Sequence, residues 1–392
     1  MKDIVVSNKV HYLGTNDRKK QLFENIWPLQ NGVAYNSYLI ADEKSALIDT
    51  LEFGSKSDYL NEICSILNGR TLDYIIVNHM EPDHASMIGV ILRSYPSLKI
   101  VGNNKTFKML QAYYNLTEEQ FVEIKDGDKI NLGYHNLSFV LTPWVHWPET
   151  MMTYDNTDRI LFSCDAFGSF GTLDGGIFDD EICFESCFLD EMRRYYSNIV
   201  GKYSNMVQKA FVKLEGIPIR FICPSHGPVW RRDPQKPINL YDNWSKHISE
   251  EGVVIAFASM YGNTEKMADY VARLIAERGV KNIKIYDVSK THISYIISDI
   301  WRYKSVILGS CAYNTGMHPM MAHLCHELEV VNPKDKNYAL FGSFSWSGGG
   351  LKSLQAFSEK MSWHLVSDPV ELMGFPTLTK MEGFQIIANK IL

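Results

Sequence analysis

The chain lacks the usual features of a membrane or secreted protein. Its 392 residues contain no apolar run approaching the roughly 18–20 residues of a membrane span. Residues 1–6 have neither an apolar core nor a small-residue cleavage site, so we expect no signal peptide. Basic residues are not in excess, because 39 lysines and arginines against 45 acidic residues give a net charge of −6. This balance argues against nucleic acid or an anionic membrane as a partner, and we expect a cytoplasmic protein.

Cysteine is scarce and forms no recognisable pattern. The seven cysteines are an odd set, and no C-x-x-C pair typical of a zinc ribbon or a rubredoxin is present. The one close pair is Cys183 and Cys187. In a cytoplasmic chain we expect most of the seven thiols to be reduced and buried, and we interpret Cys183 and Cys187 as core residues.

The length predicts two or three domains, and the chain divides near residues 245–252. A polar, turn-rich stretch at 230–237 precedes this point, and a new apolar strand follows it. We therefore predict one domain over residues 1–249 and a second over 250–392. In the first, strands at 33–40, 45–49, 72–77, 136–142 and 159–165, with a helix at about 57–68, predict sheets flanked by helices.

The second part alternates strands and helices more regularly. Strands are expected at 253–259, 283–287, 305–309 and 338–343, and helices at about 264–278, 319–328 and 349–361. Alternation at this spacing predicts a parallel, doubly wound α/β sheet.

Four side chains that can bind metals occur within six residues, directly after the apolar run 74–77. They are His79, Glu81, Asp83 and His84. His79 and Glu81 can face one ion while Asp83 and His84 turn to a second, so the spacing suits two metals. Two imidazoles with two carboxylates suit iron or manganese at least as well as zinc.

Three further candidate ligands stand where other apolar runs end: His146, Asp165 and His226. Strand ends commonly deliver polar side chains to one rim, so we expect these residues to join the first four. We interpret the other histidines as structural or surface residues, including His135 and the helix-spaced pair His323 and His326.

This ligand pattern resembles the metallo-β-lactamase-like domain of flavodiiron proteins. Zinc hydrolases of that superfamily have histidine where this chain has Glu81, and the extra anionic oxygen favours iron. The resemblance implies an αββα sandwich in which His79, Glu81 and His146 bind one iron. It assigns Asp83, His84 and His226 to the other and makes Asp165 the bridge, with His84 the least certain ligand. Residues 193–196 resemble a segment near the diiron pocket, but an ordinary helix with two half-buried tyrosines explains them equally well.

A second motif follows the strand at 253–258 and opens a helix. It resembles the phosphate loop of flavodoxins, in which hydroxyls and backbone N–H groups cradle a phosphate, and it comprises Ser259, Met260, Tyr261, Gly262, Asn263 and Thr264. Two later loops follow other strands of the same sheet, and they supply Cys311, Ala312, Tyr313, Asn314, Thr315 and Gly316, and then Ser345, Trp346, Ser347, Gly348 and Gly349. Together the three loops predict a site for FMN rather than FAD, with Trp346 stacking on the flavin.

The resemblance covers essentially the whole chain. It implies an oxidoreductase in which electrons pass through FMN to a non-haem diiron centre that reduces O2 to water, NO to N2O, or both. It further implies a homodimer, or a dimer of dimers, in which each flavin serves its neighbour's irons. The sequence contains no fused rubredoxin, so we expect a separate electron donor: rubredoxin, a deazaflavin or a reductase.

Two other interpretations remain open at this point. The first is a zinc hydrolase of the metallo-β-lactamase type fused to a flavodoxin. The second is a non-enzymatic redox carrier or sensor whose metal site is vestigial.

Overall fold

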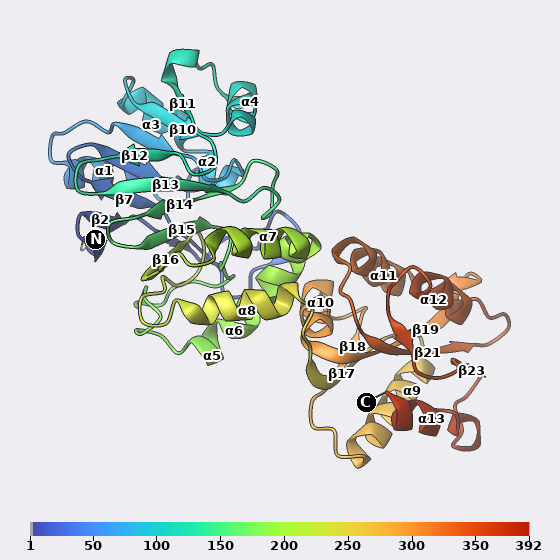
Figure 1. Cartoon of the computed structure of the whole chain (residues 1–392). Helices are drawn as coiled ribbons and strands as arrows, with labels where there is room; N and C mark the ends of the chain where they lie inside the picture. Colours follow the sequence, from blue (N-terminus) through green and yellow to red (C-terminus); the bar gives the residue numbers. More distant parts are fainter. Residues whose placement is uncertain (1–2, 392) are drawn as a thin grey trace. The chain divides into compact units, whose positions relative to one another are not determined.

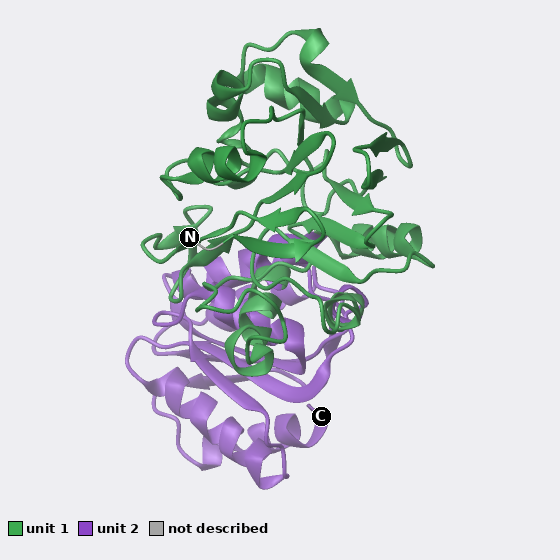
Figure 2. Cartoon of the chain, turned by 90° about the vertical axis from the view of Figure 1, so that its left-hand side faces the viewer, with its two compact units in different colours: residues 1–196, 203–242 green, residues 197–202, 243–392 purple. Residues whose placement is uncertain are grey.

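The computed structural model describes residues 3–391, which form two compact units (Figures 1 and 2). The first unit extends to Tyr196 and includes Tyr203–Asp242, and the second comprises Ser197–Lys202 and the chain from Asn243 onward. Strand β17 of the second unit begins at Glu250. The boundary between residues 249 and 250 stays a prediction, because the division between the units falls slightly earlier in the chain.

Two sheets form the centre of the first unit. The larger has seven strands in the order β1 (Ile4–Ser7), β2 (Val10–Tyr12), β7 (Tyr38–Ala41), β8 (Ser45–Ile48), β9 (Tyr74–Ile76), β10 (Lys99–Gly102) and β11 (Phe121–Glu123). Strands β8 to β11 are parallel, and their connections include α1 (Tyr59–Leu67), α2 (Pro82–Ala85), α3 (Ile88–Ser94) and α4 (Asn104–Tyr113). In Figure 1 the last three of these helices lie beside β10 and β11.

The second sheet has five strands in sequence order: β12 (Lys129–Asn131), β13 (Asn136–Leu141), β14 (Met151–Asp155), β15 (Ile160–Cys164) and β16 (Phe221–Pro224). Its helices are α5 (Phe184–Cys187), α6 (Leu189–Tyr195), α7 (Ser204–Leu214) and α8 (Gln235–Ser245). Two small ribbons complete the unit, one of β3 (Thr15–Asp17) with β6 (Val33–Tyr35) and one of β4 (Leu22–Phe23) with β5 (Trp27–Pro28). The arrangement is the expected αββα sandwich.

The second unit is a parallel sheet in the order β18 (Ile283–Asp287), β17 (Glu250–Ala258), β19 (Tyr303–Tyr313), β21 (Asn337–Phe344) and β22 (His364–Leu365), with β23 (Val370–Met373) also on β21 and β20 (Gly316–Met317) on β19. This 2-1-3-4-5 order is that of flavodoxin-like folds. The helices are α9 (Asn263–Glu277), α10 (Ile293–Arg302), α11 (Pro319–Val331), α12 (Gly350–Ser358) and α13 (Phe384–Lys390). In Figure 1, α9 and α13 lie below the sheet and α11 and α12 above it.

Two features of the structure differ from the sequence-based expectation. The run 33–40 is not one strand, because Asn36 and Ser37 interrupt it and turn their side chains to other loops. Cys183 and Cys187 are exposed, so the expectation that they are buried was wrong.

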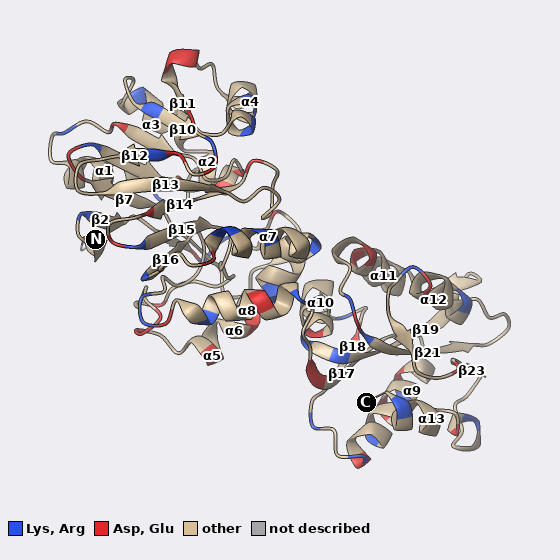
Figure 3. Ribbon diagram, viewed as in Figure 1, with Lys and Arg blue, Asp and Glu red and all other residues tan. Residues whose placement is uncertain are grey.

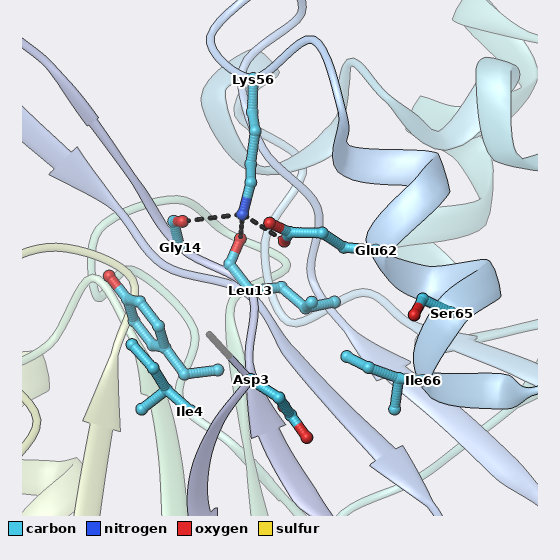
Figure 4. Close-up of a pocket in the computed structure, with 9 residues that line it drawn as sticks. Asp3, Ile4, Leu13, Gly14, Lys56, Glu62, Ser65 and Ile66 are labelled. Atoms are coloured by element: carbon cyan, nitrogen blue, oxygen red, sulfur yellow. Dashed lines mark hydrogen bonds and ion pairs between the residues drawn. The ribbon is translucent and has the colours of Figure 1, made fainter. Parts of the chain in front are cut away.

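A buried ion pair fastens the amino-terminal strands of the first unit to helix α1 (Figure 4). Lys56, whose side chain is only 4% exposed, donates hydrogen bonds to the carbonyl oxygens of Leu13 and Gly14 at 3.3 and 3.0 Å and to Glu62 Oε2 at 2.5 Å. The three acceptors neutralise and solvate the ammonium, which makes its burial tolerable. The pair lies on the wall of a small cavity of about 80 Å³.

Lysine and arginine are interspersed with aspartate and glutamate over the helices of both units (Figure 3). Among the described residues, no helix is both long and apolar enough to cross a membrane.

Candidate metal and flavin sites

The first site collects all seven candidate metal ligands, which arrive from the ends of three strands, one short helix and one loop. His79 follows β9, Asp165 follows β15 and His226 follows β16. Glu81 occupies the N-cap of α2, and α2 itself carries Asp83 and His84. The β13–β14 loop supplies His146. The side chains form two buried groups whose ligand atoms lie within 4.8 Å of one another: His79, Glu81, His146 and Asp165 in the first group, and Asp83, His84 and His226 in the second.

Asp165 lies between the two groups and faces both. Its Oδ2 atom is 3.3 Å from Nε2 of His79 and 3.3 Å from Nε2 of His146. Its Oδ1 atom is 3.0 Å from Nε2 of His84 and 3.3 Å from Nε2 of His226. One oxygen thus serves each group, which is the geometry of a carboxylate that bridges two ions.

Several of the ligand atoms are buried without hydrogen-bond partners, whereas Nε2 of His79 and His146 lies 3.3 and 3.0 Å from Glu81 Oε2. Within residues 3–391, both carboxylate oxygens of Asp83 and Asp165 and Nε2 of His84 and His226 make no hydrogen bond. Leaving a buried polar atom unpaired costs about 1–3 kcal/mol, and more if the atom is charged. Five of these six atoms face the second group, and Asp165 Oδ2 faces the first, which is the arrangement expected if cations complete their coordination.

The electrostatics of the cluster point the same way. Burial disfavours a charged imidazole, yet the close carboxylates raise the pKa of His146 to about 9 and that of His226 to about 10. Burial also opposes ionisation of Asp165, but the charge of His84 and the other imidazoles 3.3 Å from its oxygens lower its pKa well below the usual value. The cluster therefore attracts positive charge, and a metal cation would take the place of those protons.

Several residues that hold the ligands were not identified from the sequence. Asp49, at the end of β8, accepts hydrogen bonds from N and Nδ2 of Asn78 at 2.7 and 3.0 Å and so fixes the residue before His79. Thr50 donates to the carbonyl oxygen of His84 through its N–H and its hydroxyl. Asn36 donates to the carbonyl oxygens of Pro224 and Gly227 on both sides of His226. No local pattern marks these residues, because each acts on a segment distant in the sequence.

The two tyrosines of the segment 193–196 differ sharply. Both are fully buried. The Tyr195 ring is 5.6 Å from that of His226, and within the described part of the chain its hydroxyl makes no hydrogen bond. The Tyr196 hydroxyl shares a hydrogen bond of 2.9 Å with Ser204 Oγ. Tyr195 therefore belongs to the lining of the metal site, whereas Tyr196 is a satisfied core residue.

A separate group of potential ligands, His135, Asp155 and Asp158, shares no residue with the seven and is explained by its hydrogen bonds. His135 Nδ1 lies 2.9 Å from Asp155 Oδ2, and its Nε2 lies 2.7 Å from the carbonyl oxygen of Asn8. Both ring nitrogens donate to oxygen acceptors, so neither has a lone pair for a metal. His135 is structural, as its sequence context suggested.

The second site is a pocket of about 290 Å³ at the carboxyl ends of the parallel strands in the second unit. Three loops line it with Ser259, Met260, Tyr261, Asn263, Thr264, Cys311, Ala312, Asn314, Thr315, Ser345, Trp346 and Ser347. Ser343 and Phe344, at the end of β21, also line the pocket but were not among the predicted residues. The predicted residues Gly262, Tyr313, Gly316, Gly348 and Gly349 stand beside it in the same loops.

The glycines shape these loops. Gly262 has a φ of 85° at the N-cap of α9, and its N–H donates to Ser259 Oγ at 3.0 Å, which directs the free N–H groups of the helix toward the pocket. A Cβ atom at Gly349 would stand 2.0 Å from the carbonyl oxygen of Thr315, so the second and third loops can touch only because a glycine is there.

Two large aromatic side chains on the pocket wall are strongly exposed: Tyr261 at 91% and Trp346 at 76%. Exposed aromatic rings above a helix N-terminus fit a ligand that combines a phosphate with a planar ring. The residues present therefore fit FMN.

Comparisons with known proteins agree with this geometry. Residues 33–227 match the family described as ODP family beta lactamase, and residues 255–367 match the flavodoxin family. The chain is 32% identical over 384 residues to the anaerobic nitric oxide reductase flavorubredoxin of Escherichia coli O1:K1, covering 94% of this chain and 80% of the relative.

Solved structures give the same result. The rubredoxin oxygen:oxidoreductase of Desulfovibrio gigas superposes with a TM-score of 0.94 at 29% identity, covering 100% of this chain and 98% of that one. A mutant form of the flavo di-iron protein of Thermotoga maritima superposes with a TM-score of 0.91 at 25% identity, covering 100% of this chain and 97% of that one. A β-lactamase-like unit with a buried two-position ligand cluster, followed by a flavodoxin-like unit, places this chain in the flavodiiron protein family.

Proposed function

We propose that the chain is an oxidoreductase that reduces O2 to water, NO to N2O, or both, at a non-haem diiron centre supplied with electrons through FMN. The observation that carries the proposal is the pair of buried ligand groups that share Asp165. Two metal positions in one protein, next in sequence to a flavin unit, suit the delivery of several electrons to one small molecule. Relatives named as a nitric oxide reductase and an oxygen oxidoreductase support both substrates.

The ligand assignment follows the two groups. His79, Glu81 and His146 would hold one iron, Asp83, His84 and His226 the other, and Asp165 would bridge them. His84 belongs with the second group because its Nε2 atom lies 3.3 Å from Asp83 Oδ1 and 3.0 Å from Asp165 Oδ1. Three carboxylates with four imidazoles favour iron over a softer metal. Glu81 contributes an oxygen ligand at the place where zinc hydrolases of the superfamily have a histidine nitrogen.

When bound, two ferrous ions and reduced FMN supply four electrons, enough to take O2 to two waters, and two of these suffice to convert two NO molecules to N2O. The chain's own residues create the conditions for this chemistry. Burial of all seven ligands excludes bulk water. The Tyr195 hydroxyl makes no hydrogen bond in the described structure, and it would be available to donate one to a small molecule bound beside His226, whose ring lies 5.6 Å from that of Tyr195.

FMN would be held by the three loops of the second unit. The N-terminus of α9, with Ser259, Asn263 and Thr264, would receive the phosphate. Trp346 and Tyr261 would contact the isoalloxazine ring, and backbone groups of the loop from Cys311 would contact its edge. Tyr313, Gly316, Gly348 and Gly349 complete the loops that we assign to the flavin.

We further propose that the protein is cytoplasmic and works as a homodimer, or a dimer of dimers, in which each flavin serves the irons of the neighbouring chain. Its electrons would come from a separate donor: rubredoxin, a deazaflavin or a reductase. The names of two relatives, which include the words flavorubredoxin and rubredoxin, favour a rubredoxin-type donor.

The variant Asp165→Ala tests the proposal. It removes the bridging carboxylate, so we expect loss of iron and of O2 or NO consumption, with FMN absorbance unchanged. Asp174→Ala, which deletes a carboxylate that is 81% exposed, is the matched control and should leave iron content and turnover intact. Iron analysis and an anaerobic stopped-flow mix of the reduced protein with O2 or NO give the readouts. Unchanged turnover in Asp165→Ala, or two zinc ions with thioester or lactam hydrolysis in the wild type, would refute the assignment.

A further inference from the structure

The two proposed iron positions have ligands of the same composition. Each would receive one terminal carboxylate and two imidazoles, and the bridging Asp165 gives one oxygen to each side. Any built-in difference between the positions must therefore come from the groups behind the ligands, which set the orientation and the basicity of each imidazole.

A buried carboxylate stands behind His79. Glu149 Oε1 accepts a hydrogen bond from His79 Nδ1 at 2.7 Å and a second from the backbone N–H of Met80 at 2.9 Å. Glu149 is only 1% exposed, and Asn103 Nδ2 donates to its carbonyl oxygen at 2.6 Å, so both its side chain and its main chain are held. Because Nδ1 must carry the proton in this bond, the lone pair of Nε2 faces Glu81 and Asp165.

The corresponding acceptor in the second group is neutral. His226 Nδ1 lies 2.9 Å from the carbonyl oxygen of Ala34, which fixes the same tautomer without adding charge. A carboxylate behind an imidazole makes it a more basic, more electron-donating ligand than a carbonyl does. The two positions thus have matched ligands but unequal surroundings.

We infer that Glu149 is a positioning residue that fixes the tautomer of His79 and makes the two iron positions inequivalent, because its carboxylate accepts from His79 where a neutral carbonyl oxygen faces His226. The inference rests on the proposed diiron function and deepens it. It predicts that the ion at His79 binds more tightly and favours its oxidised state more strongly than the same ion would without Glu149.

The test uses the full-length, FMN-containing chain after its metal has been removed, titrated anaerobically with Fe²⁺. Glu149→Ala should weaken one of the two Fe²⁺ equivalents by about 10–100-fold and leave the other nearly unchanged. Glu149→Gln should rescue part of this affinity, because Met80 N–H keeps the amide oxygen pointing at His79. Glu123→Gln is the matched control, since this exposed carboxylate lines the same surface pocket of about 290 Å³ as Glu149 but has no contact with a ligand.

A redox titration followed by electron paramagnetic resonance gives a readout that a purely structural role would not change. In Glu149→Gln, the potential of one iron should become more positive while the unfolding temperature and FMN content stay at wild-type values. If Glu149→Gln leaves both the Fe²⁺ affinities and the potentials unchanged, or weakens both equivalents equally, the inference is wrong. A wild-type chain that binds no Fe²⁺ would instead refute the proposed function itself.

Discussion

Removing the hydroxyl of Tyr195 should make the metal-free protein more stable. The side chain is fully buried, and its hydroxyl makes no hydrogen bond in the described structure. A buried hydroxyl without a partner costs about 1–3 kcal/mol relative to its state in water. Tyr195→Phe deletes that hydroxyl and keeps the ring against Phe23, Phe170 and His226, so the free energy of unfolding should rise by about 1 kcal/mol or more.

The neighbouring residue provides a control with the opposite sign. Tyr196 is equally buried, but its hydroxyl shares a 2.9 Å hydrogen bond with Ser204 Oγ. Tyr196→Phe removes this hydrogen bond without relieving an unpaired group, so the free energy of unfolding should fall by about 1 kcal/mol. Two identical substitutions at adjacent residues are thus expected to change stability in opposite directions.

Thermal or urea unfolding of the metal-depleted chain measures both effects. For a unit of this size, about 1 kcal/mol corresponds to a shift of roughly 2–4 °C in the unfolding temperature. With iron bound, a water or substrate at the metals can accept a hydrogen bond from Tyr195, so the gain in stability from Tyr195→Phe should shrink or reverse. If Tyr195→Phe destabilises the metal-free chain as much as Tyr196→Phe does, the hydroxyl has a partner and the reasoning fails.

Three further predictions concern buried charges and thiols. Burial lowers the pKa of Lys336 to about 7 from 10.5, so the unfolded chain binds more protons between these values and stability should rise with pH there by up to about 1.4 kcal/mol per pH unit. Urea unfolding followed by FMN fluorescence measures the free energy of unfolding of the wild type and of Lys336→Met at several pH values. If the difference between the two proteins is the same at every pH, the prediction is wrong. Lys56→Met leaves the carboxylate of Glu62 without its cation and should cost about 3 kcal/mol in urea unfolding of the first unit followed by circular dichroism, and adding Glu62→Leu should restore most of this loss. A thiol reagent should rapidly modify the three exposed cysteines of the native chain, Cys64, Cys183 and Cys187. Rapid modification of all seven cysteines would contradict the structure.

The metal ligands could be predicted from the sequence because each stands at the end of an apolar run. In β9, β15 and β16 the apolar residues specify a strand buried in the sheet, and the polar ligand that follows stands at the strand's carboxyl end, where it is buried against the other ligands. The seven residues were therefore identified by local pattern, and the structure brings all of them together.

The sequence pattern did not predict secondary structure correctly where the spacing of apolar residues favours a helix but the residue types favour a strand. Helix α10 was not predicted, although its Ile293, Ile296, Ile297 and Ile300 form a buried helical stripe. Isoleucine is β-branched and favours strands, so the composition concealed the helical spacing. The expectation for the two cysteines failed because Phe184 in α5 and its C-cap residue Phe188 take the buried side, which leaves Cys183 and Cys187 exposed.

The residues that tune the site could not have been predicted, because they act across long sequence distances. Glu149 is 70 residues from His79, and Asn36 is 188 residues from Pro224 beside His226. Such contacts leave no periodic signature and exist only once both sheets of the first unit have formed. The consequence is a division of roles: the local ligand motif determines which metal can bind, whereas distant residues such as Glu149 set how each ion behaves. Preference between O2 and NO should therefore depend on these distant residues, since both substrates require the same seven ligands.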